Sequence, residues 1–261
     1  MEYTFISGAT GGIGKAFAVS CAKRGYPLFL TGRSEENLSA LKERLISEFG
    51  ASVEVFACDL AKEEQRNLLI AFVKEKQMTI DRIINVAGVD IQKPFLEYEE
   101  QKVLMQIRIN AEATIALTHA LLKLRAEKTE LITISSMSSV SPMPYFALYS
   151  ATKALLTNFF TAMHYELKGE GVKVTTVLPG GVYTRPDIVE QIKRQGFWGR
   201  ISAKTPEFVA EKSLKAVKKN KLKYIPGVFN KMLNFIMNVA PKRLVLAFIN
   251  KRWKKERKDA F

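Results

Sequence analysis

The sequence predicts an α/β protein with a doubly wound parallel sheet flanked by helices on both faces, and three observations carry this prediction. Short β-rich runs alternate with helical patterns of ten or more residues over the first two hundred residues. These runs are apolar throughout, as strands covered on both faces are. The 261 residues are 47% hydrophobic and 25% charged, which is ordinary for a globular protein with a large core.

The expected elements follow one another in a regular order. Strands are expected at 3–6, 28–31, 53–57, 82–86, 131–135 and 172–178, where the β-rich runs lie. Helices are expected at 14–24, 35–49, 63–77, about 102–123, 149–169 and 206–220. After Pro179 the alternation loosens, and glycines surround the Phe197-Trp198 pair. We therefore expect a mobile substrate lid at about 183–205, inside a catalytic domain spanning residues 1–222.

Composition excludes several functional classes. Only two cysteines, Cys21 and Cys58, are present, which excludes a disulfide scaffold. With two histidines and no CxxC or HExxH motif, no metal site is expected. No targeting signal is expected at the N-terminus, and polar residues interrupt the apolar zone at 228–249, so it is not a spanning helix. The expected compartment is the cytoplasm.

The net charge of +14 is a property of the C-terminal end. Residues 212–261 contain 15 of the 40 Lys and Arg residues but only two of the 26 acidic residues, a net charge of +13. The preceding body is therefore close to neutral. Residues 223–261 are expected to form a basic amphipathic tail, and no nucleic acid is expected to bind because no recognition motif accompanies the charge.

A glycine-rich segment, residues 7–14, lies directly between the first expected strand and the first expected helix. Its pattern is Gly8-x-x-x-Gly12-x-Gly14. Glycines let the backbone approach a pyrophosphate closely, and the helix N-terminus offers unpaired N–H groups and a positive dipole. The segment therefore predicts a dinucleotide site.

Tyr149 and Lys153 are spaced four residues apart on an expected helix, and this spacing has chemical value. A phenol has an unperturbed pKa of about 10, too high for efficient proton transfer near neutrality. We expect the ammonium of Lys153 to lower the pKa of Tyr149, so that the phenol can exchange a proton with a carbonyl oxygen.

These motifs together resemble the short-chain dehydrogenase/reductase family over roughly residues 1–220. The resemblance implies a Rossmann-type sheet and hydride transfer between a nicotinamide cofactor and a ketone or secondary alcohol. It implies that Ser136, at a strand end, polarises the substrate carbonyl, that Tyr149 is the general acid or base, and that Lys153 also binds the nicotinamide ribose. It further implies that Asn110 heads a proton relay to Lys153, and that the long helices beginning near 102 and 149 build a homodimer.

The resemblance also assigns the residues that bind the cofactor. Asp59 matches the residue at the adenine ring, and Thr184 lies in the loop at the nicotinamide. Residues 85–88 match the family's Asn-Asn-Ala-Gly turn, except that Val86 replaces the second asparagine. The implied contacts are Gly8, Thr10, Gly12, Ile13, Gly14, Arg33, Asp59, Leu60, Asn85, Ala87, Gly88, Tyr149, Lys153, Pro179, Gly180, Val182 and Thr184.

The end of the second strand favours NADP(H), with NAD(H) as the alternative. A carboxylate there would bind the ribose 2′-hydroxyl and repel a 2′-phosphate, but the sequence has Arg33 instead. An Arg guanidinium suits a phosphate dianion. A second basic residue, common in the family, is replaced by Gly11.

The expected substrate contacts are largely apolar, which suits a steroid, a lipid or another hydrophobic carbonyl compound. They are Ser136, Ser138, Met143, Tyr145, Tyr149, Phe197 and Trp198, with Val89 and Val182 as further candidates. The rival interpretation is a catalytically silent NADP-binding sensor or scaffold.

The tail allows two roles that the sequence leaves open. Residues 228–239 would form an amphipathic helix with Asn230, Lys231, Asn234 and Asn238 on its polar face. Its apolar face could lie in a membrane interface, with basic residues among anionic headgroups. Alternatively, the tail helices could cover the mouth of the active site or a dimer interface.

Overall fold

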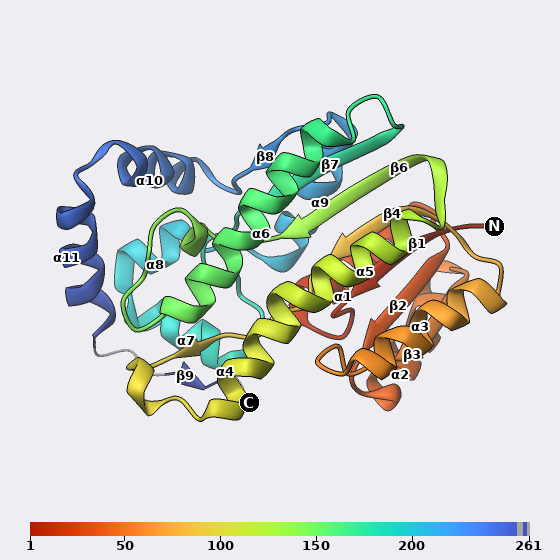
Figure 1. Ribbon diagram of the computed structural model, residues 1–261, viewed down its shortest axis with the longest axis horizontal. Coiled ribbons are helices and arrows are strands. Elements are labelled where there is room, and N and C mark those ends of the chain that lie inside the picture. Colours follow the sequence, from red (N-terminus) through yellow and green to blue (C-terminus); the bar gives the residue numbers. More distant parts are fainter. Residues whose placement is uncertain (255–257, 260–261) are drawn as a thin grey trace.

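A seven-stranded parallel sheet forms the centre of the computed structural model, which describes residues 1–254 and 258–259 (Figure 1). The strands lie in the order β3-β2-β1-β4-β6-β7-β8. Their bounds are β1 Glu2–Ser7, β2 Leu28–Gly32, β3 Val53–Ala57, β4 Thr79–Asn85, β6 Arg125–Ile134, β7 Val172–Val177 and β8 Lys223–Tyr224. The order reverses between β1 and β4, and in such sheets the ligand crevice lies at the carboxyl ends of the strands beside this point.

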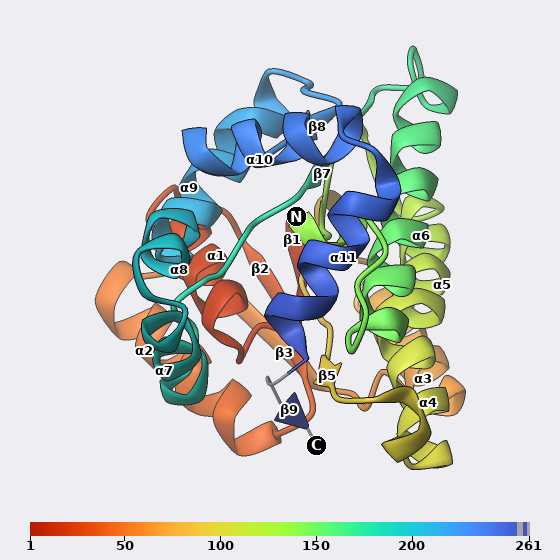
Figure 2. The ribbon, with the colours of Figure 1, turned by 90° about the vertical axis from the view of Figure 1, so that its left-hand side faces the viewer.

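Helices cover both faces of the sheet, which confirms the predicted doubly wound fold (Figure 2). One layer contains α1 (Gly12–Ala22), α2 (Glu35–Phe49) and α9 (Pro206–Lys218). The other contains α3 (Glu63–Glu75), α4 (Glu100–Ile107), α5 (Ala113–Leu122) and α6 (Ala147–Glu166). A separate apolar core lies under each layer, with Phe17 and Leu45 buried in one and Leu69 and Phe160 in the other.

The single helix expected at about 102–123 is interrupted. A π-helical segment, Arg108–Glu112, separates α4 from α5. Within it, Asn110 is fully buried, and its side-chain amide bonds both backbone groups of Val89. These bonds fix the loop after β4 against the helix. Since π-turns are commonly found at functional sites, the interruption marks this segment as part of the site.

Residues 183–205, expected as a lid, contain two short helices, α7 (Pro186–Arg194) and α8 (Gly196–Ser202). Proline at the first position of α7 suits a helix start, because its missing N–H has no partner there in any helix.

The tail forms two further helices, α10 (Val228–Val239) and α11 (Lys242–Trp253), which lie across the carboxyl end of the sheet between α8 and α6 (Figure 2). Beyond α11, the short strand β9 (Lys258–Asp259) pairs with β5 (Ile91–Gln92) in antiparallel fashion. Residues 255–257 and 260–261 of the predicted tail lie outside the described residues. None of the helices described is long and apolar enough to cross a membrane.

One detail of the tail prediction is wrong. Asn230 does not lie on a solvated polar face, because it is buried, and its Nδ2 donates to the carbonyl oxygens of Ser202 and Pro226. It packs against Gly180, where an added Cβ would lie 2.9 Å from the Asn230 amide. An asparagine on an amphipathic helix looks the same in sequence whether it meets water or a neighbouring loop.

Candidate active site

The glycine-rich turn between β1 and α1 has a shape that only glycine allows. Gly8 has a φ of +65°, in the left-handed region. A Cβ on Gly14 would lie 2.1 Å from the carbonyl oxygen of Gly8, so the first turn of α1 packs directly on the backbone of the loop. The N-terminus of α1 thereby opens on the cavity beside the turn, as a pyrophosphate site requires.

A cavity of about 1400 Å³ extends from this turn along the carboxyl end of the sheet. Its volume exceeds that of most single-ligand pockets and leaves room for a dinucleotide together with a substrate. Sixteen of the seventeen predicted cofactor residues line it. They are Gly8, Thr10, Gly12, Ile13, Gly14, Arg33, Asp59, Leu60, Ala87, Gly88, Tyr149, Lys153, Pro179, Gly180, Val182 and Thr184. The residues present therefore fit a nicotinamide dinucleotide.

Asn85 is the exception, because it does not line the cavity. Its side chain is buried behind the cavity, where Nδ2 donates to the hydroxyls of Thr118 (2.8 Å) and Thr133 (3.2 Å). Because Thr118 lies on α5 and Thr133 on β6, the amide ties the end of β4 to its neighbours. Its role is to hold the turn at 86–88 in place.

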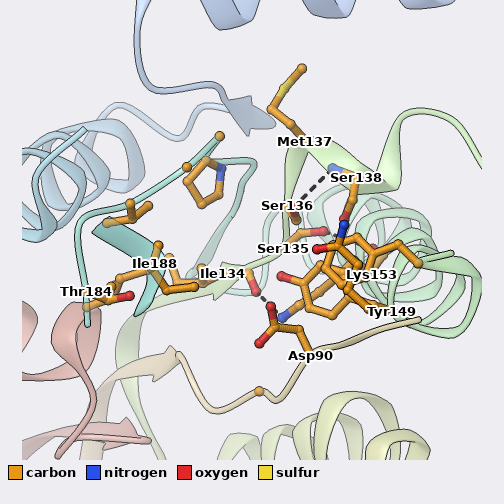
Figure 3. A pocket seen from close by; sticks show the side chains of 18 of the residues that line it. Asp90, Ile134, Ser135, Ser136, Met137, Ser138, Tyr149, Lys153, Thr184 and Ile188 are labelled. Carbon is orange, nitrogen blue, oxygen red and sulfur yellow. Dashed lines mark hydrogen bonds between the residues drawn. The ribbon is translucent and has the colours of Figure 1, made fainter. Parts of the chain in front are cut away.

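The side chains predicted to be catalytic converge from two elements. Tyr149 and Lys153 come from one face of α6, and Ser136 follows the end of β6; Figure 3 shows them in one group. Lys153 Nζ donates to the carbonyl oxygen of Ile134 (2.9 Å) and lies 5.8 Å from the centre of the Tyr149 ring. Ser136 Oγ accepts from the N–H of Ser138 (3.1 Å), which fixes the serine beside the phenol.

Burial raises the pKa of Tyr149 above its usual value, contrary to the lowering expected from Lys153. The Asp90 carboxylate raises the pKa further, whereas a hydrogen bond with Ser136 lowers it. The prediction from spacing considered the lysine alone. Removing the phenol from water disfavours the phenolate more than the hydrogen bond with Ser136 favours it. The phenol of Tyr149 is therefore neutral at physiological pH.

Burial also lowers the pKa of Lys153, to about 8, while Asp90 acts in the opposite direction. The group still carries its proton at neutral pH. Asp90 is not among the residues predicted from the sequence; it follows the turn at 85–88 by two residues. In the structure it lines the cavity beside Tyr149 and Lys153 (Figure 3).

This lowered pKa predicts a pH-dependent stability, measurable by comparing wild type with Lys153→Met. Between about pH 8 and 10.5 the unfolded chain holds a proton on Lys153 that the folded protein has lost, so stability rises with pH. Relative to the variant, the free energy of unfolding of wild type should rise by as much as about 3 kcal/mol from pH 8 to pH 10.5, and it should fall by the same amount when the pH is lowered again to 8. Urea unfolding at several pH values measures the difference, and a constant difference would contradict the burial of a titrating amine.

Asn110 lies behind the catalytic group and does not line the cavity. Its Nδ2 donates to Thr152 Oγ1 (3.2 Å) as well as to Val89, and a Cβ on Gly88 would lie within 3.4 Å of both its Oδ1 and Lys153 Nζ. It is thus close to Lys153 through Gly88, and its side chain ties the loop after β4 to α6. Its place at the head of a proton relay stays a prediction.

The substrate side of the cavity contains most of the predicted contacts. Ser136, Ser138, Met143, Tyr149 and Trp198 line it, together with the further candidates Val89 and Val182. Ser138 Oγ is buried, and among the described residues it has no hydrogen-bond partner, so it is available to a substrate.

Two predicted contacts, Tyr145 and Phe197, do not line the cavity. Tyr145 has a φ of +64° and follows Pro144 in a turn closed by the bond from Phe146 N–H to the Met143 carbonyl (3.0 Å). Phe197 is 68% exposed and packs edge-on against Trp198. The residue that follows each of them in the chain, Phe146 or Trp198, lines the cavity instead.

The tail, whose position the sequence left open, forms one wall of the cavity. Trp253, at the end of α11, stacks on Phe146 at 6.5 Å between ring centres, and Phe146 stacks on Tyr149 at 4.4 Å. Arg252 donates to Gln195 Oε1 across the gap between α11 and the α7–α8 connection (3.4 Å). The further tail residues on the wall are Phe229, Met232, Leu233, Ile236, Met237, Ala240, Leu244, Val245, Phe248 and Ile249.

Comparison with known proteins decides the family. A family model described as short chain dehydrogenase matches residues 2–195. The chain is a short-chain dehydrogenase/reductase. Members of this family are oxidoreductases that act on carbonyl or alcohol groups with NAD(H) or NADP(H). The glycine-rich turn and the Tyr149–Lys153 pair of this chain correspond to motifs of the family.

Among its relatives, a very-long-chain 3-oxoacyl-CoA reductase of Vanderwaltozyma polyspora is 32% identical over 68% of this chain and 54% of that protein. An inactive hydroxysteroid dehydrogenase-like protein 1 of Homo sapiens is 32% identical over 70% of this chain and 56% of that protein. The chain thus spans about half the length of these curated relatives. A solved 7β-hydroxysteroid dehydrogenase has the same fold, with a TM-score of 0.88 at 24% identity over 95% of this chain and 96% of that one.

Proposed function

We propose that this short-chain dehydrogenase/reductase is an NADP(H)-dependent enzyme that interconverts a ketone and a secondary alcohol on a hydrophobic substrate. The observation that carries the proposal is the convergence of Tyr149, Ser136 and Lys153 on one cavity that the glycine-rich turn also lines. A scaffold would have no need to bring these groups together beside a dinucleotide site.

The chain's own residues supply the proton and the orientation. When bound, the nicotinamide supplies or accepts the hydride. Ser136, beside Tyr149, polarises the substrate carbonyl, and the neutral phenol of Tyr149 gives its proton to the carbonyl oxygen as the alcohol forms. The raised pKa of Tyr149 keeps this donor protonated, which suits reduction at neutral pH. Protonated Lys153 stabilises the negative charge left on Tyr149.

The preference for NADP(H) rests on Arg33. It lines the cavity at the end of β2 and is exposed, so its guanidinium is accessible to a 2′-phosphate. The position after Gly32, where a carboxylate would repel that phosphate, is occupied by Arg33 itself.

Arg33→Asp should lower kcat/KM for NADPH by roughly 10–100-fold, because a charge-assisted hydrogen bond to phosphate contributes about 1.5–3 kcal/mol. Activity with NADH should be unchanged or higher, since the new carboxylate can bind a 2′-hydroxyl. Steady-state kinetics with both cofactors measures the ratio. Arg44→Asp, which removes an exposed arginine paired with Glu48 on α2, is the matched control. An unchanged ratio in Arg33→Asp would exclude Arg33 as the phosphate contact.

A hydrophobic substrate is favoured by the walls that α10 and α11 add to the cavity, which are almost entirely apolar. The name of the Vanderwaltozyma polyspora relative points to long acyl chains, and that of the solved neighbour to steroids. NADPH oxidation measured against a panel of steroids, long-chain acyl ketones and small diketones tests both the activity and the class. Turnover of small diketones alone would contradict the hydrophobic assignment.

The second candidate is a catalytically silent NADP-binding sensor, favoured by the inactive human relative. It predicts tight NADPH binding without oxidation on any member of the panel. The assembled group of Ser136, Tyr149 and Lys153 favours the enzyme.

We further propose a cytoplasmic homodimer with peripheral membrane contact through the tail. Exposed apolar residues on α4 (Leu104 and Ile107) and on α6 (Leu155 and Tyr165) support a dimer through these helices, as the family resemblance implies.

A further inference from the structure

The mouth of the cavity is bordered by apolar side chains that are both exposed to solvent and part of its lining. These five residues, here called the mouth rim, are Trp198, Met232, Ile236, Leu244 and Phe248. Each is between 46% and 67% exposed. Exposed apolar patches of this kind mark interaction sites. Because the same side chains continue into the cavity, whatever covers the rim is in direct contact with the entrance to the active site.

The two helices that carry most of the rim, α10 and α11, are basic. Between residues 212 and 254 the sequence contains no aspartate or glutamate. Lys231 on α10 and Lys242, Arg243 and Lys251 on α11 are exposed on the same two helices that carry four of the five rim residues. Further exposed apolar residues, Phe235 and Val239, extend the patch along α10. An apolar centre with cations around it complements an anionic lipid surface.

We propose that α10 and α11 dock on an anionic lipid bilayer, with the mouth rim in the acyl boundary and the basic residues among the headgroups. In this position the cavity opens into the bilayer, and a lipid substrate reaches Tyr149 without crossing water. The delivery of substrate rests on the proposed function, whereas the docking itself depends only on the surface.

Charge argues against a second copy of this chain as the occupant. A two-fold interface places the same patch of both subunits together. Lys242 and Arg243 would then face the equally basic patch of the other copy, and residues 212–254 offer no carboxylate to pair with them. Like charges held together cost free energy, whereas anionic headgroups neutralise them.

Co-sedimentation of the full chain with vesicles tests the docking. Wild type should bind vesicles of phosphatidylcholine mixed with phosphatidylglycerol, bind pure phosphatidylcholine weakly, and dissociate at high salt. Leu244→Ser/Phe248→Ser and Lys242→Gln/Arg243→Gln should each lower the partition coefficient by about tenfold or more. Matched controls lie at the opposite end of the molecule: Leu68→Ser, which alters an exposed leucine of α3, and Lys62→Gln/Lys74→Gln should bind as wild type does.

Three outcomes would overturn the docking: no binding of wild type to anionic vesicles, unchanged binding by both rim and charge variants, or a dimer in solution that Leu244→Ser/Phe248→Ser dissociates. Circular dichroism and NADPH affinity verify that each variant is folded. Failure of the proposed function is distinguishable, because a chain that binds vesicles but oxidises no NADPH with any ketone retains the docking surface and lacks the activity.

Discussion

Tyr149→Phe should lower kcat by roughly 10²–10⁴-fold, the range typical for loss of a general acid, and leave the affinity for NADPH unchanged. The variant removes one oxygen atom and retains the ring, so the stacking on Phe146 at 4.4 Å persists. Ser136, Lys153 and the glycine-rich turn are unaltered. The loss is therefore expected in the chemical step alone, as measured by NADPH oxidation under saturating ketone and by cofactor titration.

Tyr145→Phe is the matched control, because it deletes the same hydroxyl four residues away and outside the cavity. Its kcat should stay close to that of wild type. If Tyr149→Phe retained wild-type turnover, the proton would have to come from another group, and the assignment of roles would fail. If it lost NADPH binding as well, Tyr149 would act mainly by holding the cofactor.

Gly14→Ala should weaken NADPH binding by roughly 10–100-fold, because a strained core contact of this kind costs about 1–3 kcal/mol. Its Cβ would lie 2.1 Å from the Gly8 carbonyl oxygen and 2.8 Å from the Ala9 Cα, and both neighbours are backbone atoms. The loop or the first turn of α1 must therefore move, which displaces the N–H groups that face the cavity. A lower melting temperature is expected for the same reason.

Gly11→Ala is the control within the same loop. Gly11 has a φ of −78°, and a Cβ there would meet only the Gly8 carbonyl oxygen at 3.4 Å. It should retain most of the affinity and the stability. Equal NADPH affinity in the two variants, measured by titration, would show that the packing of α1 on the loop does not shape the cofactor site.

The parts of the site that could be predicted are those whose chemistry lies within a short stretch of sequence. Tyr149 and Lys153 are one helical turn apart, and the glycines at 8, 12 and 14 sit at the junction of one strand and one helix. Local spacing fixes their geometry, and the structure brings them into one cavity. Asn85 shows the limit of a motif, because position in a turn does not specify which side of the strand its amide faces.

The pKa of Tyr149 shows a second limit. Spacing predicted the nearby lysine but neither the burial of the phenol nor the carboxylate of Asp90, which comes from a different loop. Electrostatics at a site depends on every group that the fold gathers around it and on how much water it excludes. These are properties of the folded chain.

The sequence by itself determined the alternation of strands and helices, the family motifs and the basic amphipathic character of the tail, since hydrophobic periodicity and residue spacing are local properties. Only the tertiary structure decided where the tail lies. An amphipathic helix buries its apolar side equally well against a membrane, a partner or its own protein, and periodicity does not distinguish among them. Packing resolved the choice in part: one side of α10 and α11 forms a wall of the cavity, and the stacking of Trp253 on Phe146 places the last helix close to Tyr149.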